Sequence, residues 1–192
     1  MAEPQLAIRK EGARVPALAM LGKGFKGYKP EKEQPVREVE VVETEALKQL
    51  RDAWGRYESK ADHYAYGYAH GVVMGLSYSA SDVEKFSLVL AEFQDENDFS
   101  EKAGMFLSAL INNCNDKEFV IHTTHLAEPI SYLGYGNERI ITVKGNAGGD
   151  VGAYMQGGEI HIEGKLVSTG FDIHGKIFLN GELIIDKSIF DR

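Results

Sequence analysis

Few side chains in this sequence have types and spacings that could perform chemistry. His122 and His125 are potential metal ligands, but residues three apart on a strand point to opposite faces, and no cysteine or carboxylate stands beside them at metal-ligand spacing. Asp172 and His174 flank one residue and could act as an acid–base pair in a cleft, although a turn between strands is the simpler interpretation. Cys114 falls at the end of a predicted helix, where the helix dipole does not lower the pKa of a thiol. The sequence therefore predicts no catalytic residue, no metal site and no cofactor.

The composition narrows the class of protein. The chain has 192 residues and a formal net charge of -8, which argues against nucleic-acid binding because phosphate contacts need clustered lysine and arginine. Its single cysteine excludes an intramolecular disulfide and a cysteine-based zinc site and favours a reducing compartment, so we expect a cytoplasmic protein. Residues 63–81 carry no Asp, Glu, Lys or Arg, but their many tyrosines, glycines and serines make insertion into a membrane unfavourable. We therefore expect no membrane span.

Three regions follow one another along the chain. Residues 1–40 hold four of the five prolines and many charges, and we expect an extended or partly disordered arm there. Residues 41–115 place apolar side chains at helical spacing and are predicted to form a helical domain. Residues 116–192 alternate as strands do, with glycine-rich turns between them. The predicted fold class is α+β, with an N-terminal helical block followed by a short, parallel, right-handed β-solenoid.

Capping residues predict where the helices begin. Thr44 is the expected N-cap of a first helix, residues 81–84 match a capping box for a later one, and Asp98 is placed to cap the helix after that. The last two helices, joined by a short link, predict an antiparallel hairpin. The first helix would bury one apolar stripe. Its members are Leu47, Leu50, Trp54 and Tyr57.

Three glycines spaced four apart suggest close helix packing. If the region of Gly67, Gly71 and Gly75 is helical, these glycines share a face over which another backbone can approach closely. A glycine-rich loop is the alternative, because each interior glycine costs a helix about 1 kcal/mol relative to alanine.

A strand pattern recurs toward the C-terminal end. Residues 141–145, 160–164 and 177–181 each alternate apolar and polar side chains and end in glycine, at steps of 19 and 17. Such short repeats, one strand each, are typical of a parallel β-solenoid, and residues 119–123 are the candidate entering coil. Stacking the repeats aligns their residues in ladders. The inward ladders are Ile141, Ile160, Ile177 and Val143, Ile162, Leu179, the outward ladder is Thr142, His161, Phe178, and the corner holds Gly145, Gly164 and Gly181.

A meander of β-hairpins is the alternative to the solenoid. Hairpins favour two-residue turns such as Asn180-Gly181, which could close residues 177–179 onto residues 183–185. The long, glycine-rich gap between Gly145 and Glu159 favours a solenoid corner instead.

Glycines between the strands are predicted to be structural turns, because tight corners need a positive φ that only glycine adopts without strain. They are Gly145, Gly148, Gly152, Gly157, Gly158 and Gly164. A nucleotide-binding loop is the alternative, but neither a Gly-Lys-Ser/Thr sequence nor an amphipathic helix follows.

These glycines, together with Val151, Met155, Ile160 and Ile162, resemble one repeat of the GXGXG domain. That domain forms the C-terminal part of the large chain of glutamate synthase and also occurs in a component of formylmethanofuran dehydrogenase. The resemblance covers residues 138–186, and it implies a right-handed parallel β-helix that bridges catalytic domains or subunits without carrying catalytic residues. Residues 165–175 depart from the pattern because they lack the Gly-Gly corner.

We therefore expect a non-catalytic scaffold, adaptor or accessory subunit that binds a protein partner or a second copy of itself. Thr142, His161 and Phe178 are the interaction candidates, because an outward phenylalanine is not expected to face water without reason. One alternative is a small-ligand-binding protein or enzyme, with a site between the helical block and the solenoid lined by the aromatic residues of segment 64–78. Another is a polymer-forming solenoid, since residues 183–185 would leave an open strand edge.

Overall fold

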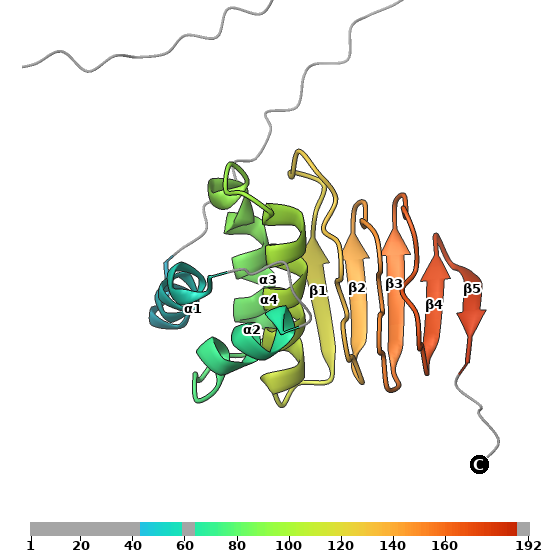
Figure 1. The fold of residues 1–192 in the computed structure, drawn as a ribbon, viewed down its shortest axis with the longest axis horizontal. Coiled ribbons are helices and arrows are strands. Elements are labelled where there is room, and N and C mark those ends of the chain that lie inside the picture. The colour runs from blue at the N-terminus through green and yellow to red at the C-terminus, as the bar shows by residue number, and fades with distance from the viewer. Residues whose placement is uncertain (1–42, 59–63, 188–192) are drawn as a thin grey trace, which may run out of the picture. The chain divides into compact units, whose positions relative to one another are not determined.

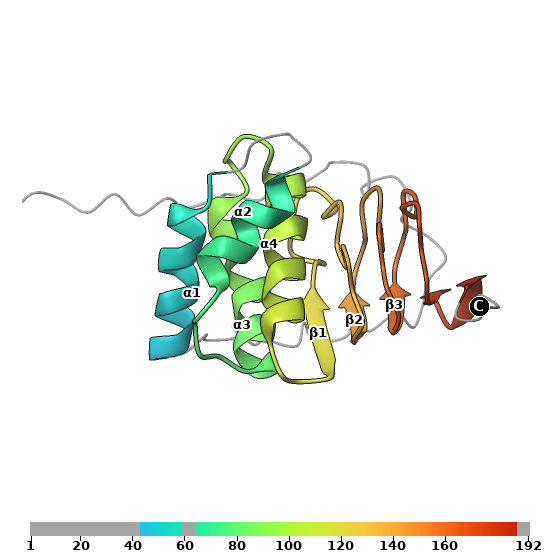
Figure 2. The ribbon, with the colours of Figure 1, turned by 60° about the horizontal axis from the view of Figure 1, so that its bottom comes forward.

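The computed structural model describes residues 43–58 and 64–187, so the arm predicted for residues 1–40 lies outside the described part of the chain. These described residues lie within one compact unit, in which helices precede a parallel β-solenoid of about three turns (Figures 1 and 2). The predicted α+β fold class is confirmed. The elements are α1 (Glu45–Arg56), α2 (Ala65–Val73), α3 (Ala80–Val89), the 3-10 turn η2 (Leu90–Phe93), α4 (Phe99–Asn113), β1 (Glu118–His122), β2 (Ile140–Lys144), β3 (Glu159–Glu163), β4 (Lys176–Leu179) and β5 (Glu182–Asp186).

The strands lie side by side in chain order, as Figure 1 shows, and β1 to β4 are parallel. Their register confirms both inward ladders, and it confirms the predicted entering coil, which is β1. The ladders are Phe119, Ile141, Ile160, Ile177 and Ile121, Val143, Ile162, Leu179. Between the strands, isolated parallel bridges also join successive coils, from Ile130 to Ala147, from Ala147 to Leu166 and from Val151 to Thr169. Aliphatic side chains from successive coils therefore bury one another in a continuous core.

The last strand departs from the solenoid prediction. β5 is antiparallel to β4, and the turn between them is Asn180-Gly181, with φ of 51° and 83°. Two positive φ angles match the two-residue hairpin turn, so the hairpin alternative holds for this pair of strands alone. The predicted corner stack of three glycines is correspondingly wrong. A Cβ on Gly164 would collide with the carbonyl oxygen of Gly145, as stacked corners require, whereas Gly181 belongs to the hairpin.

The first helix forms as expected. The Thr44 hydroxyl accepts a hydrogen bond from the Leu47 amide, with Oγ1 and N 3.1 Å apart, and the predicted apolar stripe is buried. The predicted capping box at residues 81–84 is wrong, because α3 begins earlier. Ser79 and Asp82 form the box, and the Asp116 carboxylate accepts from the Ala80 amide at 2.6 Å. A tertiary contact from the α4–β1 connection thus helps to set where α3 starts. Asp98 does precede α4, but its side chain makes no capping hydrogen bond.

The glycine row in α2 does not pack against another backbone. α2 is buried through Ala65, Ala69 and Val73, and a Cβ on Gly67 or Gly71 would have no atom within 4 Å. Close helix packing through that row is therefore wrong within the described residues. Gly75 lies beyond the helix with a φ of 84°. The glycine that does allow close approach is Gly104, in the middle of α4.

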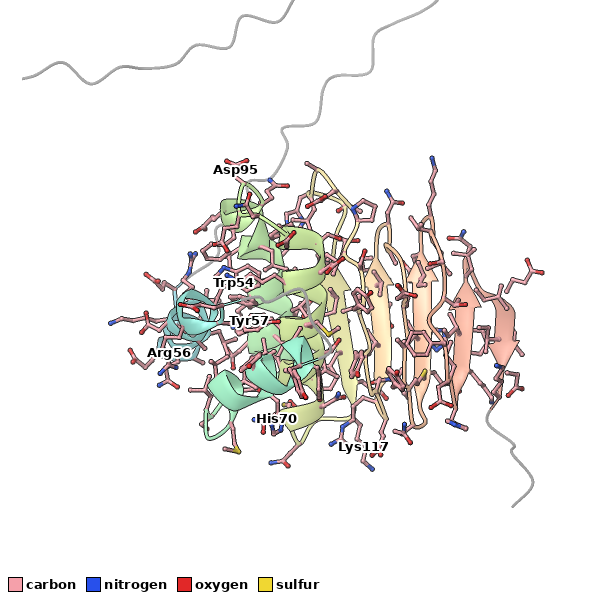
Figure 3. The ribbon with its side chains drawn as sticks, viewed as in Figure 1. Trp54, Arg56, Tyr57, His70, Asp95 and Lys117 are labelled. Atoms are coloured by element: carbon pink, nitrogen blue, oxygen red, sulfur yellow. The ribbon has the colours of Figure 1, made fainter. Side chains whose placement is uncertain are left out.

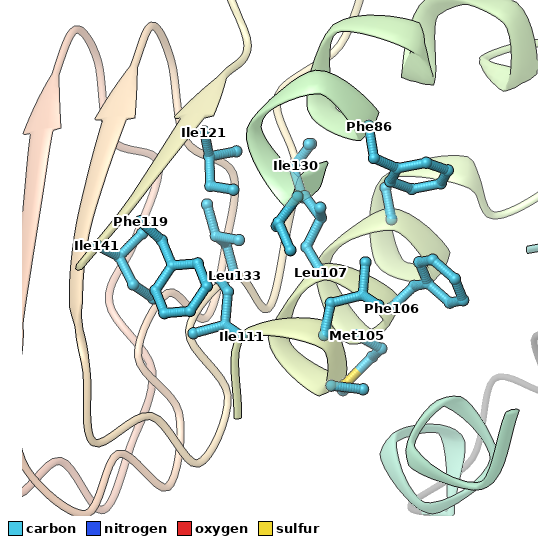
Figure 4. Close-up of a cluster of buried hydrophobic side chains, with 14 of the residues drawn as sticks. Phe86, Met105, Phe106, Leu107, Ile111, Phe119, Ile121, Ile130, Leu133 and Ile141 are labelled. Carbon is cyan, nitrogen blue, oxygen red and sulfur yellow. The ribbon is translucent and has the colours of Figure 1, made fainter. Parts of the chain in front are cut away.

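Helices α3 and α4 cover the N-terminal end of the solenoid. α3 packs along β1, and Figure 4 shows Ile111 of α4 beside Phe119 and Leu133 of the first coil. All three of these side chains are buried, in a cluster that also contains Trp54, Phe86 and Phe106 of the helices. The helices and the solenoid therefore share one hydrophobic core, and the end of the solenoid at β1 is closed.

Candidate functional site

The predicted outward ladder forms a continuous row on the outer face of the sheet. Thr142, His161 and Phe178 are neighbours in register, and each is partly buried. The rings of His161 and Phe178 stack with centroids 4.4 Å apart and planes 2° apart. On β5 the row continues to Leu183, which lies opposite Phe178 and is 45% exposed. Sequence reasoning missed Leu183 because the solenoid repeat does not include an antiparallel strand.

Charged side chains border this row and pair with one another. Nε2 of His161 lies 3.0 Å from Oε2 of Glu159, and Nζ of Lys176 lies 3.8 Å from Oε1 of the same glutamate. On the other border Lys144 pairs with Glu163. These pairs bridge adjacent strands or residues two apart on one strand, so they support the sheet.

A second row, which the sequence reasoning missed, consists of aromatic rings. Tyr66 of α2, Tyr135, Tyr154 and Phe171 contact one another in that order, with successive centroids 4.8, 5.3 and 4.6 Å apart. The first pair is stacked, the second is tilted and the third meets edge to face. The last three recur at steps of 19 and 17, the same steps as the strands. The signal was therefore present in the sequence, but it falls in the segments between strands. Exposure rises along the row, from partly buried Tyr135 to Phe171, whose side chain is 54% exposed.

The titratable candidates do not converge on a common site. His122 contacts Glu84 of α3, with Nε2 and Oε1 3.0 Å apart, which ties β1 to that helix. His174 and Asp172 do lie 3.3 Å apart on the last coil, but Asp172 is exposed and His174 is only partly buried. Burial raises the pKa of the Cys114 thiol at the end of α4. Among the described residues no group of three His, Cys, Asp or Glu side chains could hold a metal ion, and no helix in that part of the chain could cross a membrane.

Two open hollows lie beside α1, with volumes of about 430 and 190 Å³; the larger is bordered by Leu76, beyond the end of α2, and the smaller by α2 itself. Arg56, at the outer edge of the helical block in Figure 3, lines both. The other lining residues include Gln49, Asp52, Tyr68 and Val72. These hollows are not at the boundary between the helices and the solenoid, where the sequence predicted a ligand site. They do include part of the aromatic segment 64–78.

Polar side chains of α3 and α4 bond the helices to the first coil. The Ser108 hydroxyl, buried in α4, accepts from the amides of Gly134 at 2.9 Å and Tyr135 at 3.1 Å. Ser87 of α3 accepts from the His122 amide at 3.0 Å. Ser100 donates to the carbonyl oxygen of Pro129 at 2.7 Å. Three serines thus replace the strand pairing that a preceding coil would supply.

The predicted turn glycines differ in the physical reason why glycine is needed at each position. Gly145, Gly152 and Gly158 have φ of 132°, 72° and 70°, as tight corners require. Gly148 and Gly164 lack a positive φ and are constrained by space instead, because a side chain there would meet the neighbouring coil. A Cβ on Gly157 would meet nothing within 4 Å, and its φ is not positive, so neither reason applies to it.

The arrangement defines a class of protein: a short β-solenoid closed at one end by helices, with rows of aromatic and aliphatic side chains along its sides. Comparisons with protein-family models, curated proteins and solved structures gave no match. The resemblance to the GXGXG domain therefore stays a prediction.

Proposed function

We propose that this chain is a non-catalytic assembly module that holds a partner protein against the C-terminal end of its solenoid. The observation that supports this most directly is where large apolar side chains are exposed. Four of the large apolar side chains exposed in the described part of the chain lie in the last coil or the β4–β5 hairpin: Val167, Phe171, Leu183 and Ile184, which are 72%, 54%, 45% and 41% exposed. A second exposed set, Tyr64, Tyr68 and Met74, lies in or beside α2. Exposed apolar side chains gathered in one region are typical of an interaction site.

Both side rows lead to this end. The sheet row ends at Leu183, and the aromatic row ends at Phe171, whose ring has a neighbour on the Tyr154 side. Each row consists of side chains held in place by the neighbouring coil, so little side-chain entropy remains to be lost on binding. A rigid apolar surface of this kind suits a partner of fixed shape.

The polymer alternative receives less support. End-to-end growth of a solenoid requires both ends to present parallel coils, but helices cover one end, and the other ends in the antiparallel strand β5. Charged residues begin and end that strand, at Glu182 and Asp186. Charges and reversed strands are among the features that natural proteins use to limit edge-to-edge growth.

Co-purification with matched variants tests the proposal. The full chain, the double variant Phe171→Ser and Leu183→Ser, and the control Met74→Ser are expressed with a tag in the source cells. Met74 is 65% exposed but lies just beyond α2, so the control removes a comparable apolar side chain from a different region. We expect a stoichiometric partner with the wild type and the control, and its loss with the double variant. Equal recovery with all three chains, or a monomer without any partner, would contradict the proposal.

A further inference from the structure

One backbone position recurs in the corners of three successive coils, and its conformation is left-handed each time. The Gly136 amide donates to the Ala153 carbonyl oxygen, and the Tyr154 amide donates to that of Phe171, both at 2.9 Å. This pairing makes Gly136, Tyr154 and Asp172 equivalent, and their φ angles are 62°, 55° and 51°. Glycine suits such a backbone and aspartate tolerates it, but bulky residues rarely adopt it. Tyr154 is therefore held in a strained conformation.

The strain places a ring in the middle of the aromatic row. In the second coil the residue equivalent to Tyr135 and Phe171 is Ala153, which is buried and offers no ring. Tyr154, one residue further on, fills the gap, and its ring contacts those of Tyr135 and Phe171. Strained residues persist where the surrounding structure fixes them, and they cluster at binding sites. This favours a binding role for the row over a role in packing alone.

The row is most exposed at its end on the last coil. Tyr154 is 38% exposed, Phe171 is more so, and exposed Asp172 follows Phe171 directly. The three described corner segments that supply these rings and Tyr135 contain no lysine or arginine. These segments are residues 131–137, 148–156 and 167–175.

Two carboxylates lie in the same corners. Oδ1 of Asp172 is 3.3 Å from Nε2 of His174. Asp150 lies near Tyr132, and burial together with this carboxylate raises the pKa of the Tyr132 phenol. Because a carboxylate accepts several hydrogen bonds, Asp172 can accept a further donor beside His174. The exposed end of the row thus combines aromatic rings with negative charge.

We propose that this end of the row, at Tyr154, Phe171 and Asp172, binds arginine side chains of a segment of the partner protein. A guanidinium is planar, stacks on aromatic rings and pairs with a carboxylate, whereas a neutral or acidic segment gains neither contact. The net charge of -8 on the chain also favours a basic partner. This inference rests on the proposed assembly function and deepens it, because it names the chemistry by which the partner is recognised.

Synthetic fluorescent peptides test the inference by anisotropy titration with the full chain, in about 0.15 M salt to screen distant charges. Each peptide carries three identical residues separated by glycines, and these are arginine, lysine or citrulline, the neutral isostere of arginine. We expect the arginine peptide to bind at least about tenfold more tightly than the citrulline peptide, because citrulline loses both the cation–π contacts and the carboxylate pairing. The lysine peptide should lie between them, since an ammonium group cannot stack as a planar guanidinium does.

Matched variants of the chain locate the site. Phe171→Leu keeps an apolar side chain but removes the ring, and Asp172→Asn removes the charge at a backbone position that asparagine tolerates. Both positions are exposed, so thermal melts should match the wild type. Each change should weaken binding of the arginine peptide about two- to fivefold. The controls, Phe178→Leu in the sheet row and Asp95→Asn in the helical block (Figure 3), should leave binding unchanged.

Several outcomes would overturn the inference. They are no binding of the arginine peptide, equal binding of the citrulline or lysine peptide, no loss in the two row variants, or equal losses in the controls. If any of these occurs while Phe171→Ser with Leu183→Ser still loses the partner, arginine recognition falls and the assembly function stands. If the peptides behave as expected but the double variant keeps its partner, the assembly function falls instead.

Discussion

Gly104 lies at the closest approach between α4 and the first coil of the solenoid, and replacing it with alanine tests that contact directly. A Cβ at this position would overlap the carbonyl oxygen of Ser131 and lie 2.8 Å from the Ser131 carbonyl carbon. Carbon atoms in contact prefer about 3.5 to 4.0 Å, so the coil would have to move by about 1 Å or more. The obstacle is backbone, which cannot rotate aside as a long side chain can.

The size of the effect follows from what that movement disturbs. Overpacking a dense core costs about 1–3 kcal/mol. The displacement also strains the hydrogen bonds between Ser131 and Ser100 and those of Ser108 with the coil, each worth about 1 kcal/mol. The higher helix propensity of alanine relative to glycine offsets about 1 kcal/mol of this loss in stability. We therefore expect Gly104→Ala to lower the free energy of unfolding by about 2–4 kcal/mol, which corresponds to a Tm decrease of roughly 5–15 °C in a protein of this size.

Gly67→Ala is the matched control, because it makes the same substitution in the interior of α2. No atom lies within 4 Å of the Cβ position there and the φ is not positive, so only helix propensity acts. We expect this variant to gain up to about 1 kcal/mol. Guanidinium unfolding, followed by circular dichroism and by the fluorescence of buried Trp54, measures both variants. If Gly104→Ala were stabilised as much as Gly67→Ala, α4 could not lie against the first coil, and the description of a capped solenoid would be refuted.

Three other changes probe the helical block and its junction. Ser108→Ala leaves the buried Gly134 amide without its acceptor, while the Tyr135 amide keeps the Tyr132 carbonyl oxygen, so it should lower the free energy of unfolding by about 1–3 kcal/mol in the same assay. Burial by itself raises the pKa of Glu96, but hydrogen bonds from Lys102 and Trp54 outweigh it and lower that pKa. The stability from this carboxylate is therefore present above its unfolded pKa of about 4.3 and is lost as pH falls through the lower folded pKa. Glu96→Gln should cost under about 1 kcal/mol at pH 7, since the pair is partly exposed, and unfolding curves should show that difference vanish in acid. The Cys114 thiol, buried and with a raised pKa, should react with a thiol reagent at least about tenfold more slowly in the native chain than in denaturant.

The solenoid coils could be predicted from the sequence, because their buried residues recur at regular steps. Ile141, Ile160 and Ile177 must bury one face of a strand, and their steps of 19 and 17 match one coil each, so register followed from counting. The same steps in Tyr154 and Phe171 mark the aromatic row. That row lies in the segments between the strands, where apolar and polar residues do not alternate, so the strand pattern did not reveal it.

The predictions that were wrong concern features that depend on contacts between segments far apart in the sequence. The glycine spacing in α2 resembles a packing motif, yet among the glycines in the described helices only Gly104 meets another backbone, because the first coil crosses α4 there. The start of α3 depends on Asp116, which follows the next helix. Local propensity carries no information about either partner. The candidate site was affected in the same way: the row through Phe178 was predicted, but its continuation to Leu183 required the chain to reverse at Asn180.

That reversal also limits what can bind at this end. A further coil would need a parallel neighbour in register with β4, but β5 occupies that edge with its direction inverted. A parallel solenoid from another molecule therefore cannot continue the ladders of Ile160 and Ile177 beyond β5. A partner with a flat apolar surface would not require the coil repeat to be maintained. Under the proposed assembly function, binding at this end would therefore stop after one partner, which suits a module that joins components in fixed stoichiometry better than one that forms filaments.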